Sequence, residues 1–154
     1  MSDLITRRTL IGRGAAVLAG LAVPPLAAAR PPGTPMVVYK DPSCGCCHDW
    51  VEIMRKAGFE VSTRDTAKMQ AVKARYRVAA ELVSCHTALV GGYVVEGHVP
   101  ADLIRKMLRE KPPVIGLAVP GMPMGSPGME GPQKEAYDVL LFSAGGKTTV
   151  YAKR

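Results

Sequence analysis

The chain carries a concentration of sulfur at one place, where three of its four cysteines stand within four consecutive positions. The full set is Cys44, Cys46, Cys47 and Cys85. Thiolates are soft ligands that suit Cu(I), but the same side chains can also exchange disulfides or staple a small fold. The cysteines therefore allow three alternatives, namely a metal site, a redox pair or structural disulfides.

The first cluster, residues 44–48, directly precedes a predicted helix. Free backbone N–H groups and the helix dipole favour thiolate over thiol at such a position. Cys44 and Cys47 have the spacing of a redox pair, with Cys44 as the exposed nucleophile. Cys46 distinguishes the alternatives, because disulfide exchange needs two cysteines whereas a soft-metal site gains from a third. We predict a Cu(I) site, with a metal-free thiol–disulfide oxidoreductase using Cys44 and Cys47 as the alternative.

Histidines accompany the cysteines, although the chain contains only three. His86 directly follows Cys85 in a loop before a predicted strand, and His98 stands just ahead of a predicted helix. We expect this loop to face the first cluster, so that Cys85, His86 and His98 become ligands. His48 lies on the first predicted helix, and its role stays open because its face of that helix is not determined.

Methionines gather in residues 120–130, where proline and glycine exclude a helix or a central strand. Thioethers are soft, neutral ligands, and we predict that Met122 contributes to copper binding. The same argument applies to Met124 and Met129, which can equally be adaptable hydrophobes that cover the core.

A zinc site and a disulfide scaffold are both less consistent with the spacing of the cysteines. Zinc sites usually combine two separated cysteine knuckles, whereas three of these sulfurs crowd one helix start. A chain of 154 residues can bury a core without disulfide staples. Copper is therefore the predicted metal.

Hydrophobic periodicity and turn signals indicate the elements that position these residues. The predicted order is strand, helix, strand, helix, strand, strand, helix, over residues 36–39, 44–58, 59–63, 65–77, 87–90, 93–96 and 102–109. A closing hairpin, 137–142 and 148–151, follows a long Pro/Gly/Met-rich loop at 111–132. This order is typical of an α/β, thioredoxin-like three-layer fold with a central mixed sheet.

The first residues have the composition of an export signal rather than of a folded domain. Arg7 and Arg8 precede an apolar run that ends in the small residues 27–29, as in twin-arginine signals. We predict a signal peptide over 1–29, a linker over 30–35 and one metal-binding domain over 36–154. The mature protein is then periplasmic, and an uncleaved signal anchor is the alternative.

Composition argues against several functions. The chain has a net charge of +7 and only 5% aromatic residues, and its basic residues are not interleaved with aromatics, so we expect no nucleic-acid partner. Beyond the signal, charge, glycine or proline interrupts every apolar run, so we expect no membrane association after cleavage. No carboxylate pair, serine elbow or phosphate-binding glycine loop indicates hydrolysis.

Four motifs in the chain resemble those of the CopG-like proteins of bacterial copper-resistance systems. They are residues 39–47, 84–87, 94–100 and 116–132, and the resemblance spans 36–154. It implies a thioredoxin-like, periplasmic protein in which Cys44, Cys46, Cys47 and Cys85 gather copper, helped by His86, His98 and Met122. Copper ions, and another periplasmic copper protein that receives them, are the expected partners. The resemblance also raises the hypothesis of a copper-dependent oxidoreductase, in which Cys44 and Cys47 are catalytic.

Overall fold

The computed structural model describes residues 33–154, which belong to one compact unit. The predictions for the signal peptide, and for residues 30–32 of the linker, lie outside the described residues. In chain order the elements are β1 (Thr34–Lys40), α1 (Gly45–Lys56), β2 (Phe59–Asp65), α2 (Met69–Arg75), the 3₁₀ turn η1 (Ala80–Leu82), β3 (Thr87–Val90), β4 (Tyr93–Glu96), α3 (Ala101–Glu110), β5 (Gly116–Ala118), β6 (Asp138–Phe142) and β7 (Thr148–Lys153).

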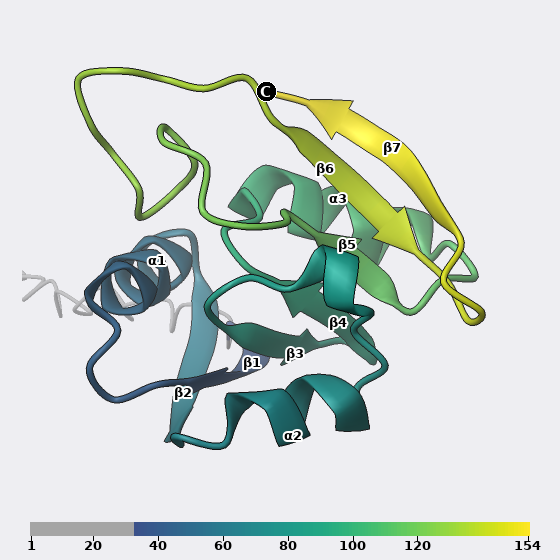
Figure 1. The fold of residues 1–154 in the computed structure, drawn as a ribbon, viewed down its shortest axis with the longest axis horizontal. Coiled ribbons are helices and arrows are strands. Elements are labelled where there is room, and N and C mark those ends of the chain that lie inside the picture. Colours follow the sequence, from purple (N-terminus) through teal and green to yellow (C-terminus); the bar gives the residue numbers. More distant parts are fainter. Residues whose placement is uncertain (1–32) are drawn as a thin grey trace, which may run out of the picture. The chain divides into compact units, whose positions relative to one another are not determined.

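The strands form a mixed seven-stranded sheet in the order β2-β1-β3-β4-β5-β6-β7 (Figure 1). β1 pairs with β2 and β4 pairs with β5 in parallel, and the other pairs are antiparallel. Up to α3, the elements follow the predicted thioredoxin-like order. The prediction of an α/β fold with a central mixed sheet is confirmed.

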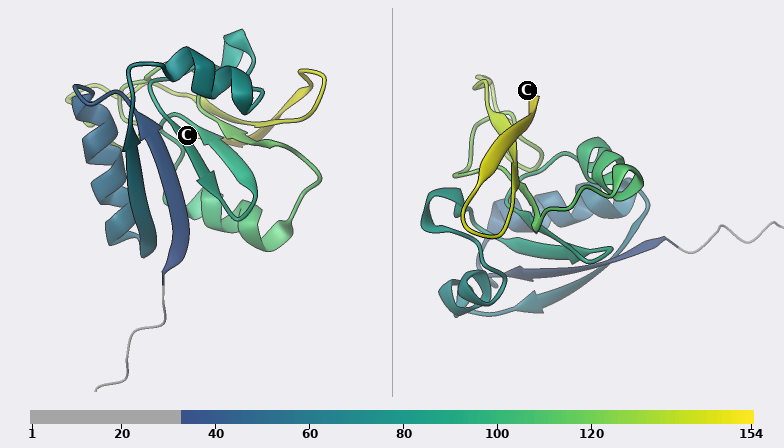
Figure 2. Two further views of the ribbon diagram at one scale, coloured as in Figure 1. Left: turned by 90° about the horizontal axis from the view of Figure 1, so that it is seen from below. Right: turned by 90° about the vertical axis from the view of Figure 1, so that its right-hand side faces the viewer.

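Helices cover both faces of this sheet, as the views in Figure 2 show. One core contains side chains from α1 and α3, and a second, smaller core contains side chains from the α2–η1 segment. The neighbours Val94 and Val95 of β4 lie in different cores, because successive strand residues point to opposite faces. The two cores therefore lie on opposite faces of the sheet, each between the sheet and the helices that cover that face.

Each of the two longer helices buries one face. In α1 the buried residues recur at the spacing of one helix face, and they are Cys47, Trp50, Val51 and Met54. In α3 they are Leu103, Ile104 and Met107. Among residues 33–154, no helix is both long and apolar enough to cross a membrane.

Several element boundaries differ from the prediction, two of them with consequences for the neighbouring residues. β1 begins at Thr34, so Thr34 and Pro35, which were predicted as linker, pair with the start of β2. α2 begins at Met69 rather than near residue 65, because Asp65 still pairs with Lys40 as the last residue of β2. The N-cap residue of α2 is Lys68, whose backbone N–H donates to the Thr66 hydroxyl at 3.1 Å.

The predicted loop at 111–132 contains a strand, β5, and the loop prediction is wrong there. A strand of three residues is too short to show a period of two. β5 lies between β4 and β6, so it joins the C-terminal hairpin to the rest of the sheet. Gly116 permits this pairing, because a Cβ at that position would overlap the carbonyl oxygen of Val94.

Replacement of Gly116 by alanine should force β4 and β5 apart. We expect Gly116→Ala to lower the free energy of unfolding by at least about 2 kcal/mol, as overpacking of a rigid site does. Chemical denaturation measures the loss. Gly45→Ala is the matched control, because a Cβ there meets no atom within 4 Å, and equal stability of the two variants would contradict the account.

Candidate metal centre

A tight turn places the first cysteine at the start of α1. The Asp41 carboxylate accepts hydrogen bonds from the Ser43 backbone N–H at 2.9 Å and from its hydroxyl at 2.5 Å. The Cys44 N–H donates to the Asp41 carbonyl at 3.1 Å. These bonds make Cys44 the N-cap residue of α1, and Cys46 and Cys47 follow in its first turn.

The structure brings the four predicted cysteines together. Cys44 and Cys47 form a disulfide with a Cα–Cα distance of 5.4 Å. The sulfur of Cys46 lies 3.6 Å from that of Cys44 and 3.9 Å from that of Cys85. All four sulfurs lie within 4.8 Å of one another, so the prediction that they meet is confirmed.

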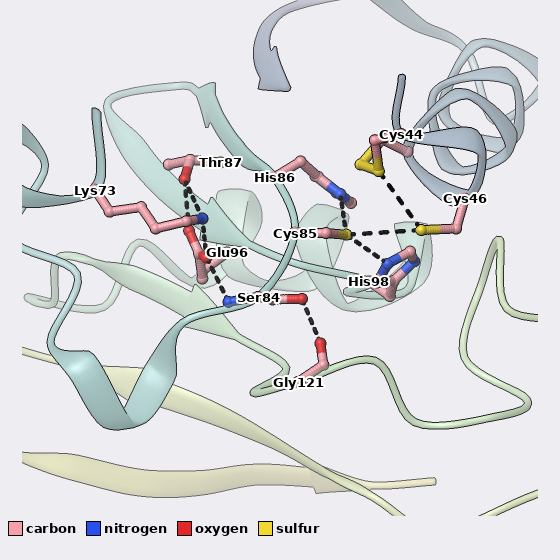
Figure 3. A network of polar contacts seen from close by, with 11 residues as sticks. Cys44, Cys46, Lys73, Ser84, Cys85, His86, Thr87, Glu96, His98 and Gly121 are labelled. Atoms are coloured by element: carbon pink, nitrogen blue, oxygen red, sulfur yellow. Dashed lines mark hydrogen bonds and ion pairs between the residues drawn. A yellow bond between two sulfur atoms is a disulfide. The ribbon is translucent and has the colours of Figure 1, made fainter. Parts of the chain in front are cut away.

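Cys85 also belongs to a second donor group, which it forms with the two predicted histidines. Its sulfur lies 2.9 Å from His98 Nε2 and 3.3 Å from His86 Nδ1 (Figure 3). The donor atoms of these three residues again lie within 4.8 Å of one another. The sulfur cluster and the histidines therefore share one atom, Cys85 Sγ.

The hydrogen bonds of His98 determine which ring nitrogen carries the proton and which presents a lone pair to Cys85. Nδ1 lies 2.8 Å from the carbonyl oxygen of Pro127, which can only accept a hydrogen bond. Nδ1 therefore carries the proton, and Nε2 presents its lone pair to Cys85 Sγ. Burial lowers the pKa of His98, which favours this neutral form.

His86 is fully buried and retains an unused nitrogen. Its ring lies between Trp50, at a centroid distance of 4.4 Å, and His98, at 5.0 Å. Its Nε2 atom has no hydrogen-bond partner among the described residues. Burial moves the pKa of His86 well below its ordinary value, so the ring is a neutral imidazole in an apolar setting.

Burial acts on the cysteine in the opposite sense. It raises the pKa of the Cys85 thiol to about 12, and the neighbouring Cys46 adds to this rise. Without a bound cation, Cys85 is therefore a thiol whose proton points to a histidine lone pair. A cation that replaced this proton would find sulfur and neutral nitrogen ligands at one point.

The donors fit a soft metal ion. They are sulfurs and imidazole nitrogens, and Cys44, Cys46 and Cys85 are partly exposed, which gives an ion access from solvent. In the disulfide form, two of the four thiols are consumed, so the full sulfur set requires reduction of Cys44–Cys47.

A purely structural role for the disulfide has little support. Cys44 and Cys47 are three positions apart, so their bond closes a very short loop and removes little entropy from the unfolded chain. Cys46 and Cys85 remain free thiols although their sulfurs are close. The described cysteines therefore do not form the paired staples of a disulfide scaffold.

The structure does not place the remaining candidates, His48 and the three loop methionines, among these two donor groups. His48 is exposed and its Nε2 accepts a hydrogen bond from the buried Lys40 Nζ at 3.1 Å, so it belongs to neither donor group. Met122 is 51% exposed and follows Gly121, whose carbonyl accepts a bond from the Ser84 hydroxyl beside Cys85. Met124 and Met129 are partly buried in the same loop. A role for these methionines in copper binding stays a prediction.

Sequence reasoning missed the residues that hold the donors in place. Trp50 packs against His86 and donates its indole N–H to the Val99 carbonyl at 3.1 Å. Gly128 adopts a φ of +83° and lets its loop close against the first turn of α1. Buried Lys73 and Glu96 lie behind Cys85, and no local signal distinguished them from surface charges.

Comparisons with known proteins agree with this site. Residues 82–129 match the family described as "Protein of unknown function, DUF411". No curated protein matches the chain.

Two solved structures, of copper resistance protein copG in Form 1 and Form 2, resemble the whole described unit. Each is 44% identical to this chain, with a TM-score of 0.75. Each match covers 79% of this chain and 98% of the other. This identity over nearly the full length of those proteins shows that the chain belongs to the CopG-like family of copper resistance proteins.

Proposed function

We propose that this protein binds copper as Cu(I) through the thiolates of its four cysteines and serves copper resistance in the periplasm. The observation that carries the proposal is the convergence of four sulfurs, from two distant segments, within 4.8 Å. Cu(I) prefers sulfur over oxygen ligands, and thiolates can bridge more than one ion. His86 and His98 supply the neutral nitrogens that complete the site around Cys85.

The exposed side of the centre suits exchange of copper with another protein. Cys44 and Cys46 lie at the start of α1 and are partly exposed, whereas Cys47 is buried. Met122 is half exposed, follows Gly121, whose carbonyl accepts a hydrogen bond from Ser84, and offers a soft thioether, which makes it a candidate for the transfer step. The export signal predicted over 1–29 supports a periplasmic location.

The disulfide favours a further activity of the same residues, as a copper-linked oxidoreductase. The reduced pair of Cys44 and Cys47 can give one electron to each of two Cu(II) ions. This step forms the disulfide and two Cu(I) ions, and releases two protons. The structure contains the pair in its oxidised form, and a dithiol protein partner is then required to reduce it again.

The same disulfide also supports the alternative, a metal-free thiol–disulfide oxidoreductase. In that case Cys44 and Cys47 act on protein thiols, and Cys46 and the histidines have no role as ligands. The two functions therefore differ in their dependence on Cys46.

Replacement of Cys46 by serine distinguishes copper binding from metal-free disulfide exchange. We expect Cys46→Ser to weaken Cu(I) binding by at least about tenfold, because it removes a central sulfur, and to leave disulfide exchange by Cys44 and Cys47 nearly unchanged. Anaerobic titration of the reduced protein against a Cu(I) chelator measures the affinity, and reduction of a model disulfide measures the exchange.

Gly45→Ala is the matched control, because it lies beside Cys46, contributes no ligand atom, and a Cβ there meets no atom within 4 Å. A reduced wild-type protein that loses all Cu(I) to a weak chelator would contradict the proposal. Retention of Cu(I) by Cys46→Ser at the wild-type affinity would exclude Cys46 from the site.

Copper binding should also depend on pH. Because the pKa of the Cys85 thiol is raised to about 12, Cu(I) must displace its proton at neutral pH. The apparent affinity should therefore increase with pH, by up to about tenfold per pH unit for each proton displaced. Competition titrations from about pH 6 to about pH 8 test this, and Cys85→Ser should show a shallower dependence. A wild-type affinity that does not change with pH would refute the prediction.

A further inference from the structure

A buried ion pair lies directly behind the Cys85–His86 segment. The Lys73 ammonium of α2 and the Glu96 carboxylate of β4 are 2.5 Å apart, and their side chains are 4% and 0% exposed. Taking two charges out of water is costly, and a well-packed apolar pair often stabilises a fold equally well. Because stability alone does not explain a buried ion pair at this place, its contacts on either side of the Cys85–His86 segment indicate a role.

The carboxylate of Glu96 accepts hydrogen bonds from both residues that flank the two ligands. Its Oε1 atom accepts the Ser84 backbone N–H at 2.8 Å, and its Oε2 atom accepts the Thr87 hydroxyl at 2.6 Å (Figure 3). The Lys73 ammonium donates to the same hydroxyl at 3.2 Å. One buried side chain thus fixes the segment on both sides of Cys85–His86.

Further bonds complete this clamp, by which we mean Lys73, Glu96, Ser84 and Thr87. The Gly97 N–H donates to the His86 carbonyl at 3.0 Å, and Thr87 is the register partner of Glu96 in the β3–β4 pair. The backbone of 84–87 is therefore held from inside the fold. The side chains of Cys85 and His86 take no part in these bonds, and they contact each other and the sulfur of Cys46.

We propose that Glu96, paired with Lys73, is a positioning residue for copper binding, because it holds Cys85 Sγ and His86 Nδ1 in place for the metal. This inference rests on the proposed copper site. A segment that is already ordered loses less conformational entropy when the metal binds, so the affinity is higher. Partners that orient metal ligands in this way typically change metal affinity by about 10–100-fold when they are lost.

Two matched double variants isolate the clamp from the ion pair. K73M/E96Q and K73M/E96L both remove the two charges, so neither leaves an unpaired charge in the interior. The glutamine amide still accepts the Ser84 N–H and can donate to the Thr87 hydroxyl, whereas leucine does neither. We expect K73M/E96Q to bind Cu(I) within about threefold of the wild type, and K73M/E96L to bind about 10–100-fold more weakly.

A stability control separates positioning from general damage to the fold. Val139→Ala removes buried apolar atoms from β6, outside the clamp and both donor groups, and should lower stability without changing Cu(I) affinity. Each variant is titrated in its reduced form at a temperature where circular dichroism shows it folded. If K73M/E96L does not fold, Thr87→Val replaces it, because valine removes only the hydroxyl, with its bonds to Glu96 and Lys73, and should still weaken binding.

The outcomes distinguish the two proposals. If the wild-type protein retains no Cu(I), the proposed function itself fails. If the wild type retains Cu(I) and the glutamine and leucine variants bind it equally well, the positioning role of Glu96 is overturned. An unchanged affinity in Thr87→Val, used in the same test, would overturn it as well.

Discussion

The sulfur of Cys85 is the atom on which the rest of the site depends. It lies 3.9 Å from the sulfur of Cys46 and 2.9 Å from Nε2 of His98, so it joins the cysteines of α1 to the histidines. Each neighbouring segment holds one of its partners. The turn before α1 presents the first cluster, the loop before α3 presents His98, and the carbonyl of Pro127 fixes the protonation of that ring. A thioredoxin-like sheet brings these segments to one edge, because β1 and β3 are neighbours and run antiparallel.

Burial makes the charge of Cys85 Sγ depend on whether a cation is bound. Burial disfavours both the Cys85 thiolate and the charged imidazoles, and without a metal the three residues remain neutral. In the proposed function, a soft cation would replace the thiol proton and offset that cost through its bonds to sulfur and nitrogen. The disulfide between Cys44 and Cys47 adds a second control, since it withdraws two thiols from the site. Under the proposed function, copper binding and thiol oxidation are alternative uses of the same sulfurs, and membership of a copper resistance family favours copper binding.

The sequence predicted what local patterns encode and missed what depends on distant contacts. The helix after Cys44 and the β3–β4 hairpin around Gly91 and Gly92 follow from periodicity and turn residues, and both are confirmed. β5 was missed because its three residues form a strand only between two others. The meeting of Cys85 with Cys46 was predicted from the expected topology. The orientation of His48 toward Lys40 and the pairing of Glu96 with Lys73 arise only when separate elements pack, so no local pattern predicted them. The export signal over 1–29 stays a prediction.

The most direct test of the copper site is X-ray absorption spectroscopy of the reduced protein loaded anaerobically with Cu(I). The account predicts a first coordination shell dominated by sulfur, with a minor nitrogen contribution that decreases when His98 is replaced by alanine. It also predicts an edge position characteristic of Cu(I). A shell of nitrogen and oxygen without sulfur would contradict the central claim, because it would place copper outside the cluster of Cys44, Cys46, Cys47 and Cys85.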